Sequence, residues 1–254
     1  MSLQLNLEKS RANLQLCLAK AGINVVPKLD LAFALDVSGS FLDEHRTGIT
    51  ARLLDRLIPW GLTFDPDQQL EVFTFSNGVR AAHAVGAVNA SNHAGFMSEQ
   101  IVGKVPGWGG GTDYAPVLEK VLDHFGWLPA KAACTSLWQR IGQQWFDKPV
   151  EEDRQHRDCT SSLLIVVTDG ENDDQAQTLR VLRESQTRRD GVYILFIGIS
   201  NQHRAFPFIE GLGERFANTG FVAINDLRGF VALDDQAINE KLLSQELLAW
   251  LRQC

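Results

Sequence analysis

Residues Leu31–Phe41 read LAFALDVSGSF, in which five apolar residues are followed by one acid and by two serines that flank a glycine. A short apolar run of this kind is typical of a strand that is buried on both faces of a sheet. The carboxylate and the two hydroxyls then lie where that strand ends. This placement indicates that the polar end of the strand has a function other than packing.

The same pattern of apolar runs and helical spacing continues along the chain. Further buried strands are predicted at 70–75, 163–167, 192–199 and 220–224, and helices at 43–60, 114–125, 174–188 and 237–252. Alternation of strand and helix predicts an α/β fold, a doubly wound and mostly parallel sheet with helices on both faces. The turn Ser76-Asn77-Gly78 predicts a hairpin, so that residues 78–85 form one antiparallel edge strand.

Two segments fit this alternation poorly. Residues 3–21 are compatible with a helix or with a pair of strands, because LQLNL alternates apolar and polar residues. We expect residues 1–27 to be an N-terminal extension that packs on the domain formed by residues 28–254. Residues 129–160 contain two tryptophans and the charged stretch EEDRQHRD, and we expect them to be an insertion in that domain.

Composition excludes several classes of partner. A net charge of -7 argues against a nucleic-acid footprint and against docking on anionic lipid, since both need clustered Lys and Arg. The apolar runs are shorter than the roughly 20 residues of a membrane span, and MSLQLNLEKS does not resemble a secretory signal. The four cysteines show no paired spacing and are expected to be reduced thiols. These features predict a cytoplasmic protein without nucleic-acid or membrane partners.

Three polar loops are predicted to meet at one edge of the sheet. The first is Asp36–Ser40, the second is the glycine loop 107–113, and the third is Thr168-Asp169-Gly170. Ligands of doubly wound sheets bind outside the carboxyl ends of the strands, where such loops gather. The loops offer only oxygen donors as candidate ligands, namely Asp36, Ser38, Ser40, Thr112 and Asp169. Oxygen donors of this kind suit a hard divalent cation, and Mg²⁺ first of all, with Mn²⁺ or Ca²⁺ as alternatives.

The three motifs resemble the von Willebrand factor A (vWA) family and its metal-ion-dependent adhesion site. DVSGS, GGGTD and VVTDG occur in the order of that family, and the order of elements extends the resemblance over roughly residues 28–250. VPGWGGGTDYAPVL and VVTDGEND resemble, more narrowly, the A-domain proteins encoded with bacterial tellurium-resistance and stress-response genes. Phe41 differs from the family, which usually has Met there, but it is apolar and not a ligand.

The resemblance implies a function as well as a fold. Ser38, Ser40 and Thr112 would bind the cation through their hydroxyls, and Asp36 and Asp169 would hold it mainly through waters or one direct bond. The cation would then stay electrophilic, and an acidic side chain of a protein partner would complete its coordination. The resemblance thus implies a non-enzymatic binding module in a tellurium-resistance or stress-response complex.

Structural roles are the alternative for each motif. Ser38 or Ser40 could cap the following helix, Thr112 or Asp113 could cap the helix at 114–125, and Asp169 could close a turn. Among these we assign the cap of helix 114–125 to Asp113. The surrounding acids are expected to form a rim around the cation: Asp43, Glu44, Glu171, Asp173 and Asp174.

Other functions are also compatible with parts of the sequence. His124, Cys134, His156 and Cys159 suit zinc by ligand type, although only His156 and Cys159 are closely spaced. A Mg²⁺-dependent phosphate or nucleotide hydrolase would need a base near the cation. The nearest candidate, His45, is expected to face solvent. In a third alternative the cation site is vestigial and the module is purely structural.

Overall fold

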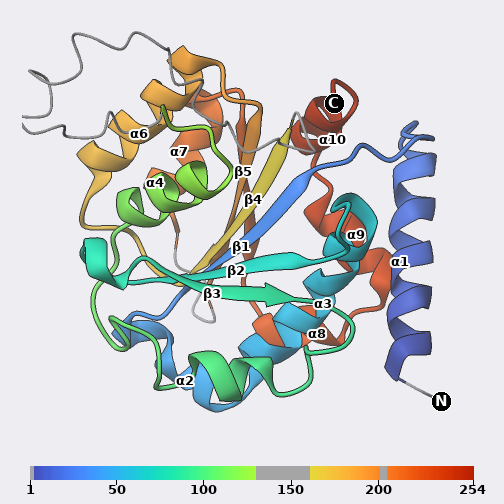
Figure 1. The fold of residues 1–254 in the computed structure, drawn as a ribbon, viewed down its shortest axis with the longest axis horizontal. Coiled ribbons are helices and arrows are strands. Elements are labelled where there is room, and N and C mark those ends of the chain that lie inside the picture. Colours follow the sequence, from blue (N-terminus) through green and yellow to red (C-terminus); the bar gives the residue numbers. More distant parts are fainter. Residues whose placement is uncertain (1–2, 130–160, 201–204) are drawn as a thin grey trace, which may run out of the picture.

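The protein, described here from a computed structural model over residues 3–129, 161–200 and 205–254, is built on a six-stranded sheet (Figure 1). The strands are β1 (Asp30–Asp36), β2 (Leu70–Phe75), β3 (His83–Val88), β4 (Ser162–Thr168), β5 (Val192–Ile199) and β6 (Thr219–Ile224). Their order is β3-β2-β1-β4-β5-β6, in which β3 is antiparallel to β2 and all other neighbours are parallel. The predicted fold class, with its one antiparallel edge strand, is confirmed.

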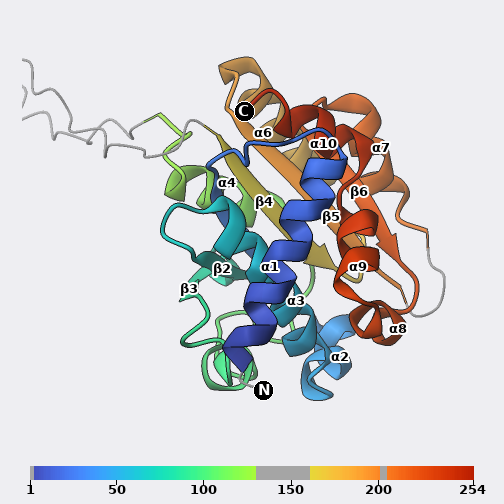
Figure 2. The same ribbon diagram turned by 90° about the vertical axis from the view of Figure 1, so that its right-hand side faces the viewer.

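Helices cover both faces of this sheet (Figures 1 and 2). One layer contains α1 (Leu3–Lys20), α3 (Ile49–Phe64), α8 (Leu227–Ala232), α9 (Asp235–Leu242) and α10 (Gln245–Leu251). The other contains α4 (Ala115–His124), α6 (Gln175–Arg188) and α7 (Pro207–Arg215). In β1 the large residues Leu31, Phe33 and Leu35 pack under the first layer, whereas Ala32 and Ala34 pack under the second. Because both faces are buried, this strand has a continuous apolar run instead of an alternating one.

Three boundaries differ from those predicted. The helix expected at 43–60 is divided into α2 (Leu42–Arg46) and α3, because Gly48 adopts a left-handed conformation with φ 75°. The helix expected at 237–252 is divided into α9 and α10, and the side chain of Ser244 caps α10 by accepting from the Leu247 amide. The edge strand begins at His83 instead of residue 78, since a 3₁₀ turn, Val79–Ala81, comes first.

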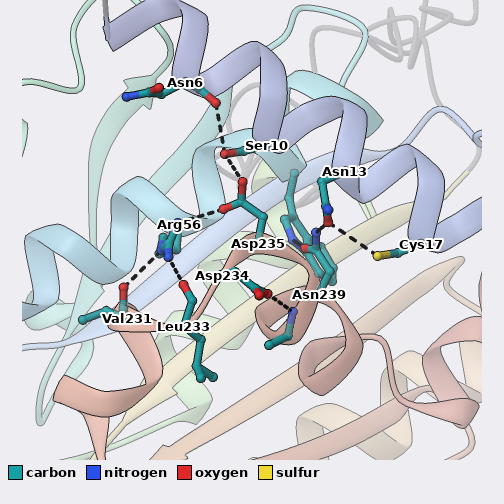
Figure 3. Close-up of polar contacts among 12 residues, drawn as sticks. Asn6, Ser10, Asn13, Cys17, Arg56, Val231, Leu233, Asp234, Asp235 and Asn239 are labelled. Carbon is teal, nitrogen blue, oxygen red and sulfur yellow. Dashed lines mark hydrogen bonds and ion pairs between the residues drawn. The ribbon is translucent and has the colours of Figure 1, made fainter. Parts of the chain in front are cut away.

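The N-terminal segment forms helix α1, which resolves the choice between helix and strands. Leu7, Leu14 and Leu18 are buried, at a spacing that suits one face of a helix, and α1 packs against α3 and α9. Ser10 comes three residues after Leu7 and four before Leu14, so it lies on the same face of α1. Its hydroxyl donates to Asp235 Oδ2 at 2.7 Å (Figure 3). Asp235 Oδ1 in turn pairs with Arg56 Nη1 of α3 at 2.8 Å. Polar contacts therefore tie the apolar interface of α1 to two other helices.

The expected division of the chain is only partly visible. From residue 130 on, the insertion expected at 129–160 lies outside the described residues, so the predicted domain boundaries stay a prediction. In the described part of the chain, none of the helices combines the length and apolar character needed to cross a bilayer.

Candidate metal centre

The candidate site lies where the winding of the sheet reverses. β1 and β4 are neighbours, but the chain leaves β1 toward β2 on one side and leaves β4 toward β5 on the other. Asp36 is the last residue of β1, and Asp169 directly follows β4. A crevice for ligands forms at such a switch point, outside the carboxyl ends of the strands. The topology thus brings the first and third predicted loops together.

Asp36 is completely buried at this point. Its Oδ1 accepts from the Ser38 amide at 2.8 Å, and its Oδ2 accepts from the Thr168 hydroxyl at 2.6 Å. Burial raises the pKa of the Asp36 carboxyl to about 7, and the neighbouring Asp169 contributes in the same direction. Both hydrogen-bond donors are neutral groups, so neither supplies a positive charge to balance the negative charge of the carboxylate. A cation bound nearby would supply it and would favour the charged form of this carboxyl.

Ser38, Ser40 and Asp169 form a chain of oxygen atoms next to Asp36. The hydroxyls of Ser38 and Ser40 are 3.3 Å apart, and the Ser40 hydroxyl donates to Asp169 Oδ1 at 2.8 Å. Ser38 is buried, whereas Ser40 is exposed. The cluster therefore extends from the interior to the surface. Ser38 precedes the 3₁₀ turn Gly39–Phe41, but its side chain makes no capping hydrogen bond there.

The glycine loop packs directly on the first loop. The Gly109 amide donates to the Val37 carbonyl at 2.8 Å, and the Gly39 amide donates to the Gly110 carbonyl, also at 2.8 Å. Gly109 has φ +80°, a conformation that favours glycine, and a Cβ on Gly39 would lie 3.3 Å from the Gly109 oxygen. These glycines allow two backbones to meet closely enough to place Thr112, which is buried, beside the first loop.

The glycine loop is also tied to the third loop, which continues from Gly170 to Asp174 before α6 begins. The Asp173 amide donates to the Thr112 carbonyl at 2.9 Å. Asp174 accepts from the amides of Tyr114 at 3.0 Å and Ala115 at 2.8 Å, at the beginning of α4. Each pair among the three loops is thus joined by hydrogen bonds. Direct contacts link Ser38, Ser40 and Asp169, whereas Thr112 is tied to the third loop through its backbone carbonyl.

The assignment of Asp113 as the cap of α4 is wrong. Asp174 performs that role from the third loop, and the N-cap position, Tyr114, makes no side-chain capping bond. Asp113 Oδ2 instead accepts from the Gly78 amide at 2.7 Å, and Asn77 Oδ1 accepts from the Gly111 amide at 2.9 Å. The turn after β2 therefore supports the glycine loop, a contact that no local sequence signal reveals.

The expected acidic rim is smaller than predicted. Asp174 is occupied at α4, and Glu171 Oε1 accepts from the Phe208 amide at 3.2 Å. Asp43 is exposed and lies 3.6 Å from Arg46, which offsets its charge. Asp173 is exposed beside Thr112, and Glu44 is partly buried in α2.

His45 is buried, contrary to the expectation that it faces solvent. Only 2% of it is exposed, and its Nε2 lies 2.8 Å from the Asp36 carbonyl oxygen while Nδ1 lies 2.9 Å from Thr50 Oγ1. Burial lowers the pKa of His45 to about 4. Both ring nitrogens are thus engaged, so this residue is not placed to act as the base of the hydrolase alternative.

The zinc alternative cannot be followed through the structure, since Cys134, His156 and Cys159 lie outside the described residues. The ring of His124 packs against two aromatic rings: its centroid lies 5.3 Å from the ring centroid of Phe73 and 5.8 Å from that of Phe125. Within 3–129, 161–200 and 205–254, no three His, Cys, Asp or Glu side chains gather as metal ligands. The candidate centre differs in kind from such a cluster, because it combines two carboxylates with three hydroxyls.

This donor set fits a hard divalent cation. All five candidate ligands offer oxygen, and the buried carboxyl of Asp36 has a raised pKa that a positive charge would reverse. The hydrogen bond from Ser40 to Asp169 joins two candidate ligands directly. The sequence predicts these five residues as ligands, and that assignment stays a prediction. The sequence does not predict the role of Thr168, whose hydroxyl donates to Asp36.

Comparisons with known proteins agree with this architecture. Residues 28–143 match the family model described as the vWA domain found in the TerF C terminus. No curated protein matches the chain significantly.

Several solved structures resemble the fold at low identity. Proximal thread matrix protein 1 of the mussel byssus is 15% identical, with a TM-score of 0.47, over 88% of this chain and 49% of its own. The manganese-loaded TRAP protein of Plasmodium vivax is 16% identical, with a TM-score of 0.45, over 87% of this chain and 73% of its own. The TFIIH p34 N-terminal domain is 12% identical, with a TM-score of 0.48, over 81% of this chain and 95% of its own. The chain thus spans about half the length of the first of these proteins.

The matched segment contains two of the three predicted loops, and the third follows β4 of the same sheet. Over residues 28–143 the chain is therefore similar to the von Willebrand factor A domain found in the TerF C terminus.

Proposed function

We propose that this protein is a divalent-metal-dependent binding module for a protein partner. Ser38, Ser40 and Thr112 would hold the cation through hydroxyl oxygens, and Asp36 and Asp169 would hold it mainly through water. When bound, the cation supplies an electrophilic position that a carboxylate can occupy. Mg²⁺ is the proposed ion. Mn²⁺ and Ca²⁺ are the alternatives, because they also bind oxygen ligands.

One observation carries this proposal: the three loops are joined in every pairwise combination at the switch point of the sheet. The first is bonded to the glycine loop through Gly39 and Gly109, and to the third loop through Asp36 and Ser40. The glycine loop is bonded to the third loop through Thr112. Capping roles alone would not require loops so far apart in sequence to meet at one place.

The buried Asp36 supports a water-mediated role in particular. Both of its oxygens already accept hydrogen bonds, from Ser38 and from Thr168. A bound cation would therefore be reached through a water, whereas the hydroxyl oxygens of Ser38 and Ser40 would bind it directly through their lone pairs. This division of roles leaves few anionic ligands in direct contact, which favours an added carboxylate from a partner.

The partner and its setting are part of the proposal. The relation to a domain of TerF points to a tellurium-resistance or stress-response complex in the cytoplasm. The partner would present an acidic side chain to the cation. Neither a membrane nor a nucleic acid is proposed as partner, since the net charge of -7 disfavours both.

Calorimetric titration with MgCl₂ tests the metal site. We expect wild-type protein to bind Mg²⁺, and we expect Thr112→Val and Asp169→Asn to lose that binding. Thr47→Val is the matched control, because Thr47 is exposed and its hydroxyl donates only to the Glu44 carbonyl. Equal heats for wild type and Thr112→Val would contradict the assigned ligands.

Affinity capture from native cytosol tests the binding function. A partner retained in Mg²⁺ should be released by a chelator, and Thr112→Val should fail to retain it. A partner that is retained equally well in the chelator and by Thr112→Val would refute metal-dependent recognition.

A screen for Mg²⁺-dependent phosphate hydrolysis tests the enzyme alternative. That alternative predicts turnover that Asp36→Asn abolishes.

A further inference from the structure

We infer that His45 is a positioning residue that holds the first loop and the glycine loop in the arrangement needed for metal binding. The inference rests on the proposed metal site. His45 belongs to α2, and no candidate ligand lies on that helix.

The first contact is with the backbone of a candidate ligand. Nε2 of His45 lies 2.8 Å from the carbonyl oxygen of Asp36. A carbonyl can only accept, so Nε2 carries the proton and donates it. This bond fixes the orientation of the peptide group between Asp36 and Val37, and hence the direction in which the chain continues to Ser38.

The second contact fixes the imidazole itself. Nδ1 lies 2.9 Å from Thr50 Oγ1 in the first turn of α3. With its proton on Nε2, the imidazole presents Nδ1 as an acceptor, and the Thr50 hydroxyl donates to it. The tautomer of His45 is therefore set from α3, and the donor remains directed at Asp36.

The ring faces connect the two loops. The centroid of His45 lies 5.0 Å from that of Phe41, directly after Ser40, and 5.2 Å from that of Trp108 in the glycine loop. Trp108 precedes the glycines that lead to Thr112. One side chain thus contacts both ends of the Asp36–Phe41 segment and the loop that brings the third hydroxyl.

The chemical type of this residue is informative. An apolar ring would pack against Phe41 and Trp108 without the cost of burying polar nitrogens. The cost of burying the two ring nitrogens of His45 is offset by two hydrogen bonds, one of which is made to the backbone of Asp36 in the candidate site. Residues that orient metal ligands from outside the coordination sphere typically change metal affinity 10- to 100-fold when they are replaced.

Two variants separate the functions of the ring. His45→Phe keeps the aromatic contacts but removes the donor, and His45→Gln keeps a donor at a similar reach. Mg²⁺ affinity is measured by calorimetry, and the melting temperature without Mg²⁺ is measured alongside it. We expect His45→Phe to weaken Mg²⁺ binding about tenfold or more, and His45→Gln to recover much of that loss.

Further measurements keep the inference testable if His45→Phe does not fold. Thr50→Val should weaken Mg²⁺ binding through the loss of the tautomer control, and ¹⁵N NMR of the wild type should show the Nε2–H tautomer. Leu247→Ala, a buried position in α10, is the control for a general loss of stability. It should lower the melting temperature without changing the affinity.

The outcomes distinguish this inference from the proposed function. If wild-type protein shows no Mg²⁺ binding, the proposed function fails and the positioning role fails with it. If the wild type binds but the His45 and Thr50 variants bind equally well, only the positioning role is refuted. An effect of Leu247→Ala as large as that of His45→Phe would also refute it, as would an Nδ1–H tautomer.

Discussion

The carboxyl of Asp36 is completely buried and lies near a second carboxylate, that of Asp169, and both conditions disfavour its charged form. Burial raises its pKa to about 7, and its partners are an amide and a hydroxyl. In the absence of a cation, replacement of this group by a neutral one should therefore cost little. In the presence of a cation, the same replacement should remove an important source of affinity.

We predict that Asp36→Asn retains stability without metal but loses the stabilisation by Mg²⁺. At a Mg²⁺ concentration 100 times the dissociation constant, a site that binds only the folded state adds about 2.7 kcal/mol to the free energy of unfolding. Wild type should show this gain in urea unfolding, and Asp36→Asn should not. Asp43→Asn, at an exposed position, should keep the gain. An equal gain in both variants would contradict the role of Asp36.

The five candidate ligands could be predicted from the sequence because three short motifs contain them. Their supporting residues could not. Thr168, Asn77 and Asp174 act across loops that are distant in sequence, so their roles depend on which strand ends become neighbours. The burial of His45 could not be predicted because a helix as short as α2 does not show in the sequence which of its sides is covered by Phe41 and Trp108.

A second acid, the partly buried Asp65, predicts a pH dependence at the opposite end of β1. Burial raises the pKa of Asp65 to about 6, although it accepts hydrogen bonds from the amides of Asp67 and Leu31. The folded state then binds a proton more tightly than the unfolded state, so this group destabilises folding as pH rises from about 4 to about 6. We expect Asp65→Asn to gain stability relative to wild type across that window and to show a constant difference above it. Urea unfolding at several pH values measures this, and a flat difference would contradict it.

Secondary-structure elements were predicted best where burial gives a continuous signal. All five apolar runs correspond to strands, because most of their residues are buried. Glu71 and Thr74 interrupt the apolar run of β2 without ending the strand. Helix boundaries were predicted less well. Apolar spacing continues across Gly48 and across Leu243, while the backbone itself breaks there, so the periodicity alone predicted longer helices.

The glycine loop has little space for an added side chain at Gly110. A Cβ on Gly110 would collide with Asn77 Oδ1 and lie 2.8 Å from Ser76 Oγ. We expect Gly110→Ala to destabilise the protein by about 1–3 kcal/mol, the usual range for overpacking, and to weaken Mg²⁺ binding. Gly111→Ala is the matched control, because its nearest neighbour would be 3.4 Å away. Chemical denaturation of the pair measures the difference, and equal stabilities would show that the loop yields.

Helix α1 depends on polar contacts as well as on apolar ones (Figure 3). Asp235 links Ser10 to Arg56, whose guanidinium also donates to the carbonyls of Val231 and Leu233. We expect Ser10→Ala to cost about 1 kcal/mol, the typical value for one hydrogen bond. Asp235→Ala should cost more, since it leaves both Ser10 and Arg56 without this acceptor. Urea unfolding provides the test, with the exposed Gln15→Ala as a control that should change little; an Asp235→Ala variant as stable as wild type would contradict the role of the network.

At the scale of the molecule, the switch point explains why the motifs meet. The doubly wound class could be predicted from alternating strands and helices, but the order β3-β2-β1-β4-β5-β6 could not. The side of the sheet on which each crossover continues is decided by packing over the whole chain. The meeting of Asp36 and Asp169 is a direct result of β1 and β4 becoming neighbours.

Hydrogen exchange should show that metal binding acts on one end of the molecule. Mg²⁺ should slow exchange at the amides that join the loops, including those of Ser38, Gly39 and Gly109. The amides of α1, which packs against α3 and α9, should exchange at unchanged rates. Slowing that is spread evenly over the chain would indicate a general stabilisation instead of a local site.

The position of α1, against α3 and α9 and away from the three loops in Figure 1, has a consequence for protein engineering. The side chains that hold α1 and the proposed metal ligands form separate sets. A more robust variant could be obtained by redesigning the contacts beneath the first helix, with the recognition chemistry left as it is. Conversely, the ion preference could be altered at the strand ends in a scaffold already strengthened in this way.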